Sequence, residues 1–108
     1  MLRSPASGLS PELANGNFSN DCCGTIELRD GHMTANGARW ISYRIEVDEQ
    51  GPYLLPGRFV GTQDRGIVLD GGRPVVKLRL DRLPGPTRLQ VPGVWGPDIF
   101  LSRDRQTR

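Results

Sequence analysis

The segment ARWISYRIEV, residues 38–47, carries the clearest structural signal in this chain. Apolar and polar positions alternate along it without a break; Ile41, Tyr43, Ile45 and Val47 form one set, and Trp40, Ser42, Arg44 and Glu46 form the other. Successive side chains of a β-strand point to opposite faces. The pattern therefore predicts a strand with one buried face and one solvent-exposed face.

Two hairpin signals lie upstream of this segment. The dipeptides Asp30-Gly31 and Asn36-Gly37 suit type I′ turns, because both central positions of such a turn need a positive φ angle, which glycine adopts at little cost. The stretches GTIELR (24–29) and HMTA (32–35) flank the first turn and have the length of short strands. We expect these strands and the segment at 38–47 to be joined by tight hairpins.

Further short apolar stretches follow downstream, separated by Gly and Pro. YLLPGRFVG (53–61) predicts a strand kinked at Pro56-Gly57, and residues 67–69 predict a short strand that turns at 70–72 into RPVVKLRLDR (73–82), its expected neighbour. TRLQV (87–91) and IFLSR (99–103) complete the series. No helix of ordinary length fits between these breakers. About seven or eight short strands predict an all-β fold, a small antiparallel β-sandwich or β-barrel.

The 108 residues have the length of one domain. Residues 1–21 lack periodicity and predict a flexible N-terminal arm, residues 22–102 a single β domain, and residues 103–108 a polar C-terminal tail. No apolar run reaches the length of a membrane span, and no signal-peptide core is visible. We expect a soluble, cytoplasmic protein without a membrane partner, or a secreted or periplasmic one if a leader has been removed.

Composition and motifs narrow the functional classes. The formal net charge is only +2, although residues 55–108 hold ten Lys and Arg against five Asp and Glu. The chain contains no phosphate-binding glycine loop and no GxSxG nucleophile motif. These absences favour a non-catalytic protein and predict no cofactor.

Three residues remain as candidates if the protein is a small enzyme. His32 is the only histidine, so any imidazole acid-base chemistry must use it, with Cys22, Cys23 or a carboxylate as its partner. The adjacent cysteines cannot form an ordinary disulfide with each other. A zinc site would need two ligands beyond them, and we predict no metal. Glu27 and Glu46 could form a hydrolase carboxylate pair, but cross-strand pairing with Arg29, Arg44, Lys77 and Arg79 explains them more simply.

Five residues are candidates for binding. Trp40 and Arg44 share the polar face of one predicted strand, and Lys77 and Arg79 lie on the outer face of another. Aromatic stacking beside cations would suit single-stranded nucleic acid. Trp95 lies on a Gly-rich loop, where it would either anchor a partner or close one end of a barrel.

We therefore predict a non-catalytic binding or interaction domain for a protein or small-molecule ligand. A single-stranded nucleic-acid-binding barrel is the first alternative. A small enzyme that uses His32 is the second.

Overall fold

The computed structural model describes residues 9–21, 24–63, 66–94 and 96–104. A short 3-10 helix, η1 (Pro11–Ala14), precedes ten strands. The strands are β1 (Gly16–Asn20), β2 (Gly24–Arg29), β3 (His32–Ala35), β4 (Ile41–Asp48), β5 (Gly51–Pro56), β6 (Phe59–Gln63), β7 (Gly66–Asp70), β8 (Leu78–Leu80), β9 (Arg88–Val91) and β10 (Ile99–Arg103). No helix in the described residues is long and apolar enough to cross a membrane.

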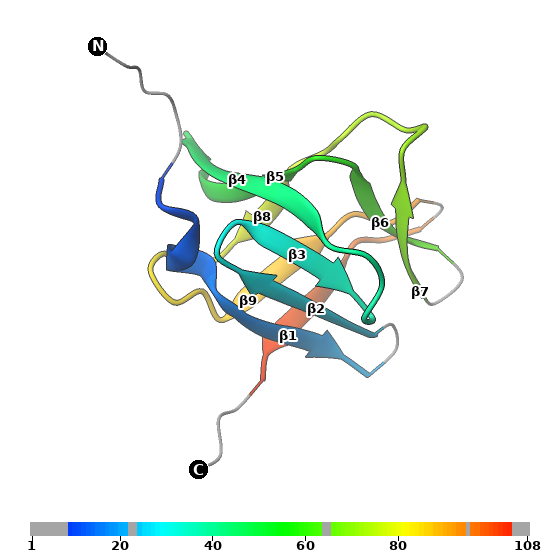
Figure 1. Cartoon of the computed structure of the whole chain (residues 1–108), viewed down its shortest axis with the longest axis horizontal. Helices are drawn as coiled ribbons and strands as arrows, with labels where there is room; N and C mark the ends of the chain where they lie inside the picture. Colours follow the sequence, from blue (N-terminus) through cyan, green and yellow to red (C-terminus); the bar gives the residue numbers. More distant parts are fainter. Residues whose placement is uncertain (1–8, 22–23, 64–65, 95, 105–108) are drawn as a thin grey trace.

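Eight of these strands form a closed antiparallel barrel, as the all-β prediction allowed (Figure 1). Its order is β1-β10-β9-β8-β5-β4-β3-β2, and β1 completes the circle by pairing with both β10 and β2. Closure leaves the barrel strands without long free edges. Of the two predicted folds, the structure is therefore the barrel and not the sandwich.

The hairpin β6–β7 forms a separate two-stranded sheet. It lies to one side of the barrel in Figure 1 and is joined to it by a parallel bridge between Thr62 and Gly93. Val60 of β6 is fully buried in the main core, and Ile67 and Leu69 of β7 pack against that core. The hairpin therefore extends the barrel core without joining its ring of hydrogen bonds.

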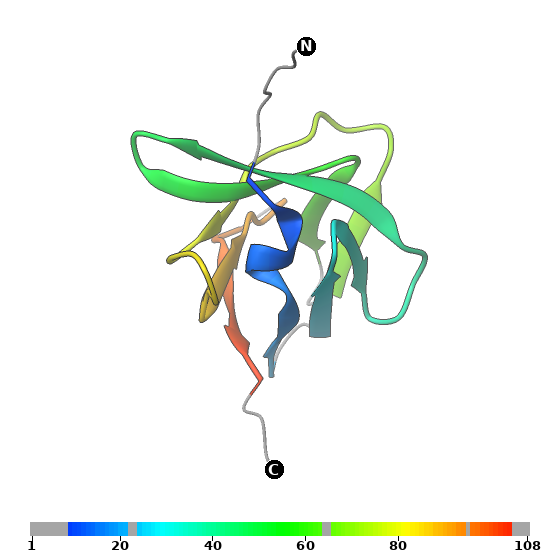
Figure 2. The same cartoon turned by 60° about the vertical axis from the view of Figure 1, so that its left-hand side comes forward.

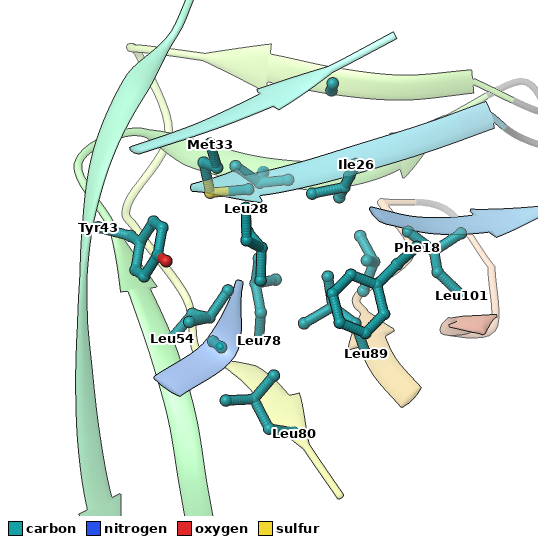
Figure 3. Close-up of a cluster of buried hydrophobic side chains, with 14 of the residues drawn as sticks. Phe18, Ile26, Leu28, Met33, Tyr43, Leu54, Leu78, Leu80, Leu89 and Leu101 are labelled. Atoms are coloured by element: carbon teal, nitrogen blue, oxygen red, sulfur yellow. The ribbon is translucent and has the colours of Figure 1, made fainter. Parts of the chain in front are cut away.

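The barrel interior is filled by inward side chains from all eight strands (Figure 3). The residues labelled there are Phe18, Ile26, Leu28, Met33, Tyr43, Leu54, Leu78, Leu80, Leu89 and Leu101. Tyr43 donates its hydroxyl proton to the carbonyl oxygen of Pro11 at 3.0 Å, which ties η1 to the barrel. Burial raises the pKa of this phenol.

The two predicted type I′ turns are confirmed by their backbone angles. Asp30 and Gly31 have φ angles of 50° and 91°, and Asn36 and Gly37 have φ angles of 53° and 76°. Asn36 adds a second function, because its side-chain oxygen accepts the backbone N–H of Thr25 at 2.8 Å. The strand that follows begins at Ile41, three residues later than residue 38.

The predicted flexible arm over 1–21 is corrected for its described part. Residues 9–20 contain η1 and β1, and Phe18 of β1 is fully buried. The predicted polar tail is likewise one residue too long, because Arg103 is the last residue of β10. The first error arises because an isolated apolar residue such as Phe18 carries no periodicity but still fills the core.

Three strand assignments also differ from the prediction. The stretch 53–61 is divided between β5 and β6, which belong to different sheets. The strand at 67–69 pairs with β6 and not with the segment after it, and only Leu78–Leu80 of that segment forms a strand, between β5 and β9. Local pattern identifies a strand, but pairing between distant segments selects its neighbour.

Val47 is exposed, although its alternation predicts burial. The pairing of β4 with β5 continues to Asp48 and Gly51, whereas β5 pairs with β8 only at Tyr53 and Leu54. The end of the β4–β5 ribbon therefore extends beyond the barrel wall (Figure 2). A strand end with no third strand beside it has no core to cover its apolar side chain.

Candidate functional site

Trp40 lies in an open hollow of about 500 Å³ that Arg29, Asp30 and His32 also line. The turn at Asp30-Gly31 folds β3 back on β2 and places His32 directly opposite Arg29. Trp40 precedes β4, and its side chain is 46% exposed. The hollow thus combines a large exposed aromatic ring with an imidazole and a guanidinium group.

A second hollow of about 440 Å³ continues this surface across β4 and β5. Ser42, Arg44, Leu55 and Val75 are among its lining residues. The two hollows meet at the β3–β4 ladder, because His32 of the first is the register partner of Ser42 of the second. We call the combined surface, lined by Arg29, His32, Trp40, Ser42, Arg44 and Leu55, the Trp40 face.

The arginines of the Trp40 face are the outer members of two ion pairs. Arg29 pairs with Glu27, and Arg44 pairs with Glu46 at 3.0 Å. The arginine side chains are 66% and 62% exposed, whereas the two glutamates are 27% and 26% exposed. Both pairs lie within a single strand, two residues apart, and are not the cross-strand pairs that the sequence predicts. The face consequently presents positive charge outward.

The next part of the barrel surface holds a connected polar network. Glu46 accepts the hydroxyl proton of Tyr53 at 3.2 Å in addition to its bond from Arg44. Arg79 and Lys77 lie over the Tyr53 ring at 5.1 Å and 4.6 Å from its centroid. The ring is therefore covered by cations and is buried.

Asp48 holds both of these cations. Arg79 binds its two carboxylate oxygens at 2.8 Å and 2.6 Å, and Lys77 binds one of them at 2.8 Å. Hydrogen bonds from Arg79, then from Lys77, hold the pKa of the Asp48 carboxyl far below its usual range. Both cations thus form ion pairs with a residue of their own chain.

One outward row crosses five strands of the barrel. Its members are successive register partners on β4, β5, β8, β9 and β10, namely Glu46, Tyr53, Arg79, Gln90 and Phe100. Phe100 is 47% exposed, and the guanidinium of Arg88 lies 5.6 Å from the centroid of its ring. Arg88 makes no ion pair among the described residues.

The predicted binding residues therefore fall into two groups. Trp40 and Arg44 lie on the Trp40 face, while Lys77 and Arg79 belong to the Asp48 network. Trp95 lies outside the described residues. Sequence reasoning did not select Arg29 or Phe100. The alternation of IFLSR, with Phe100 opposite in sense to Leu101, was the signal for an exposed Phe100.

The candidate catalytic group is only partly described. Cys22 and Cys23 lie outside the described residues, and His32 lines the hollow beside Trp40. Asp30, the carboxylate beside His32 in the hollow, accepts a hydrogen bond from the side chain of Asn15 at 2.9 Å. The described residues hold no cluster of three or more His, Cys, Asp or Glu side chains placed to bind a metal ion.

The fold and surface define a small closed antiparallel β-barrel with an added hairpin and an exposed aromatic face. Comparison of the chain with protein-family models, with curated protein sequences and with solved structures gives no match.

Proposed function

We propose that this protein is a non-catalytic binding domain that holds a protein partner on its Trp40 face. The observation that carries the proposal is the exposed Trp40 in an open hollow that Arg29 and His32 also line. Tryptophan and arginine are the residues that most often dominate the binding energy of protein interfaces.

The shape of the surface favours a protein over a small molecule. Small-molecule sites are usually concave and bury most of the ligand. The two hollows of the Trp40 face are open and lie next to each other on β2, β3, β4 and β5, because His32 of one is the register partner of Ser42 of the other. An extended, shallow surface of this kind suits the side chains of a partner protein.

The charge of the surface indicates the chemistry of that partner. Arg29 and Arg44 expose their guanidinium groups more fully than the glutamates that neutralise them. A partner that places an apolar side chain against Trp40 and carboxylates beside these arginines would complement the face.

Single-stranded nucleic acid is the second candidate, favoured by the stacked pair Arg88 and Phe100. An exposed ring beside a cation without an ion pair is suited to base stacking and phosphate contact. However, Tyr53 in the same row is covered, and Lys77 and Arg79 are both engaged in ion pairs with Asp48. The observations therefore favour the protein partner.

The experiment compares Trp40→Ala with Phe100→Ala, because the two residues are equally exposed and line different hollows. Wild type and both variants serve as baits in the native host, and each captured protein is then purified and titrated calorimetrically. We expect Trp40→Ala to weaken binding by about tenfold or more and Phe100→Ala to change it little. A partner unaffected by Trp40→Ala would overturn the proposal.

Phe100→Ala and a third variant, His32→Ala, address the two alternatives. Binding to a labelled single-stranded oligonucleotide that falls steeply with salt and is lost in Phe100→Ala would favour the nucleic-acid reading. Turnover by the purified protein that is abolished in His32→Ala would establish an enzyme.

A further inference from the structure

Strand β7 has one edge with which no other described strand pairs. Its single pairing partner among the described strands is β6 (Figure 1). The eight barrel strands, by contrast, each pair on both sides. Free edges of this kind are usually protected by lysine, proline or a bulge. The sequence of β7, GIVLD, contains neither lysine nor proline.

The hydrogen bonds of β6 determine which groups of β7 point outward. Thr62 donates its backbone N–H to Pro92 at 2.9 Å, and its carbonyl oxygen accepts the N–H of Val94 at 2.8 Å. Both groups of Thr62 therefore point away from β7. In an antiparallel pair, two directly opposed residues either bond each other or both point away. Ile67, the register partner of Thr62, thus also points its N–H and carbonyl groups away from β6.

The same orientation recurs two residues later in β7, at Leu69. The described residues provide no backbone hydrogen bond to the outward groups of Ile67 or Leu69. The free edge thus carries two donors and two acceptors. Val68, between them, directs its side chain to the sheet face opposite those of Ile67 and Leu69.

We propose that this edge pairs with β7 of a second copy of the chain, antiparallel, about a twofold axis at Val68. In that register Ile67 of one copy lies opposite Leu69 of the other, so all four outward groups on each copy are satisfied by four interchain hydrogen bonds. Val68 lies opposite Val68 of the other copy, across the axis.

The charges of the strand suit this self-pairing. Asp70 is the only charged residue of β7, and the twofold places it opposite Gly66 and not opposite another carboxylate. Within its own chain the Asp70 carboxylate is already bonded to the N–H of Gly72 at 2.8 Å and to Arg73 at 3.1 Å. Pairing therefore brings no like charges together within β7. Because the contact is small, we expect a weak dimer in the micromolar to millimolar range.

The test uses the symmetry of the axis and is independent of any partner on the Trp40 face. Sedimentation analysis of the full chain over a wide concentration range should show reversible dimer formation. Val68→Lys alone and Val68→Glu alone place like charges opposite each other and should both be monomeric. An equimolar mixture of the two should form a heterodimer, because opposite charges then face across the strands.

Val47→Lys is the matched control, since Val47 is an exposed valine on β4, in the barrel sheet. It should dimerise like the wild type, and far-ultraviolet circular dichroism should confirm that every variant is folded. A wild-type chain that remains monomeric would overturn the proposal, as would a mixture of the Lys and Glu variants that fails to associate. Protection of the Ile67 and Leu69 amides from hydrogen exchange only after another protein is added would assign the edge to that protein and also overturn it.

Discussion

At the scale of single residues, Asp48 determines the role of two cations, Lys77 and Arg79, because it bonds both of them. Lys77 and Arg79 stand on an outer strand face and resemble a binding pair when read from the sequence. Asp48, 29 and 31 positions away, bonds both. These ion pairs join β8 and the residue before it to the end of the β4–β5 ribbon. An engaged guanidinium has fewer donors left for a ligand.

The ion pairs of Asp48 predict a pH-dependent contribution to stability. Because the folded-state pKa is lowered, this contribution is present above the pKa of the unfolded chain, about 3.9, and is lost as the pH falls through the folded value below it. Asp48→Asn should therefore lower the urea midpoint at pH 7, and the difference from wild type should shrink as the pH falls below about 4. Glu49→Gln is the control, since Glu49 makes no ion pair among the described residues. A midpoint difference that stays constant down to pH 2 would contradict the assignment.

Trp40 and Phe100 form the second residue-scale comparison. They are equally exposed, but Trp40 lines the hollow with Arg29 and His32, whereas Phe100 lies beside the Arg88 guanidinium, at the β10 end of the row that begins at Glu46. Because the two exposures are equal, exposure does not show which surface binds a partner. The loss of binding in Trp40→Ala or in Phe100→Ala does.

At the scale of elements, the hairpin turns show how backbone angles and side chains act together. The turn at Asn36-Gly37 ends β3, and Asn36 reaches back to bond Thr25 at the start of β2. A Cβ atom at Gly24, which has a φ angle of 117°, would collide with the Asn36 side-chain oxygen. The turn at Asn36-Gly37 therefore depends on a glycine outside the turn itself.

Two glycine substitutions separate the cost of a positive φ angle from the loss of the Asn36–Thr25 hydrogen bond. Gly37→Ala meets no atom within 4 Å, so only its positive φ of 76° is unfavourable, and we expect a loss of roughly 1–2 kcal/mol in the free energy of unfolding. Gly24→Ala must also displace Asn36 from the Thr25 N–H and should cost about 1 kcal/mol more. Urea denaturation measures both. Equal losses would show that the Asn36 bond contributes nothing to stability.

The edge of β7 is the other element-scale feature. Its outward groups follow from the bonds that Thr62 makes to the segment at 92–94, so the free edge is a consequence of how the hairpin attaches to the barrel. The charge-exchange experiment at Val68 tests this element and leaves the barrel unchanged.

At the scale of the whole molecule, β1 closes the barrel. It lies between β10 and β2, and Arg103 of β10 bonds the carbonyl oxygens of Asn15 and Pro86 at 2.9 Å and 3.0 Å. Without β1 both neighbouring strands would have open edges, and the core would lose Phe18. Barrel closure thus depends on the segment that sequence pattern assigns to an arm.

Truncation distinguishes a closing strand from an arm. A chain that begins at Asp21 should lose cooperative unfolding and its near-ultraviolet circular dichroism. Phe18→Ala in the full chain should remain folded but lose about 3–5 kcal/mol, a large part of the stability of an ordinary domain. Cooperative unfolding of the truncated chain would contradict the role of β1.

The sequence by itself determined the strand character of this protein. Alternation at 41–45 and positive-φ turns at Asp30-Gly31 and Asn36-Gly37 are local properties, because they depend on neighbouring residues and backbone angles. These signals were sufficient to predict an all-β fold. They also placed Trp40 and Arg44 on an outer face.

Only the tertiary structure decided which strands are neighbours. The inclusion of β1, the separation of β6–β7 from the barrel and the capture of Lys77 and Arg79 by Asp48 all join distant segments. The same is true of the hollow that brings Arg29 to Trp40. Such pairings depend on which distant segments bury the core jointly, and the local pattern of apolar residues does not specify those partners.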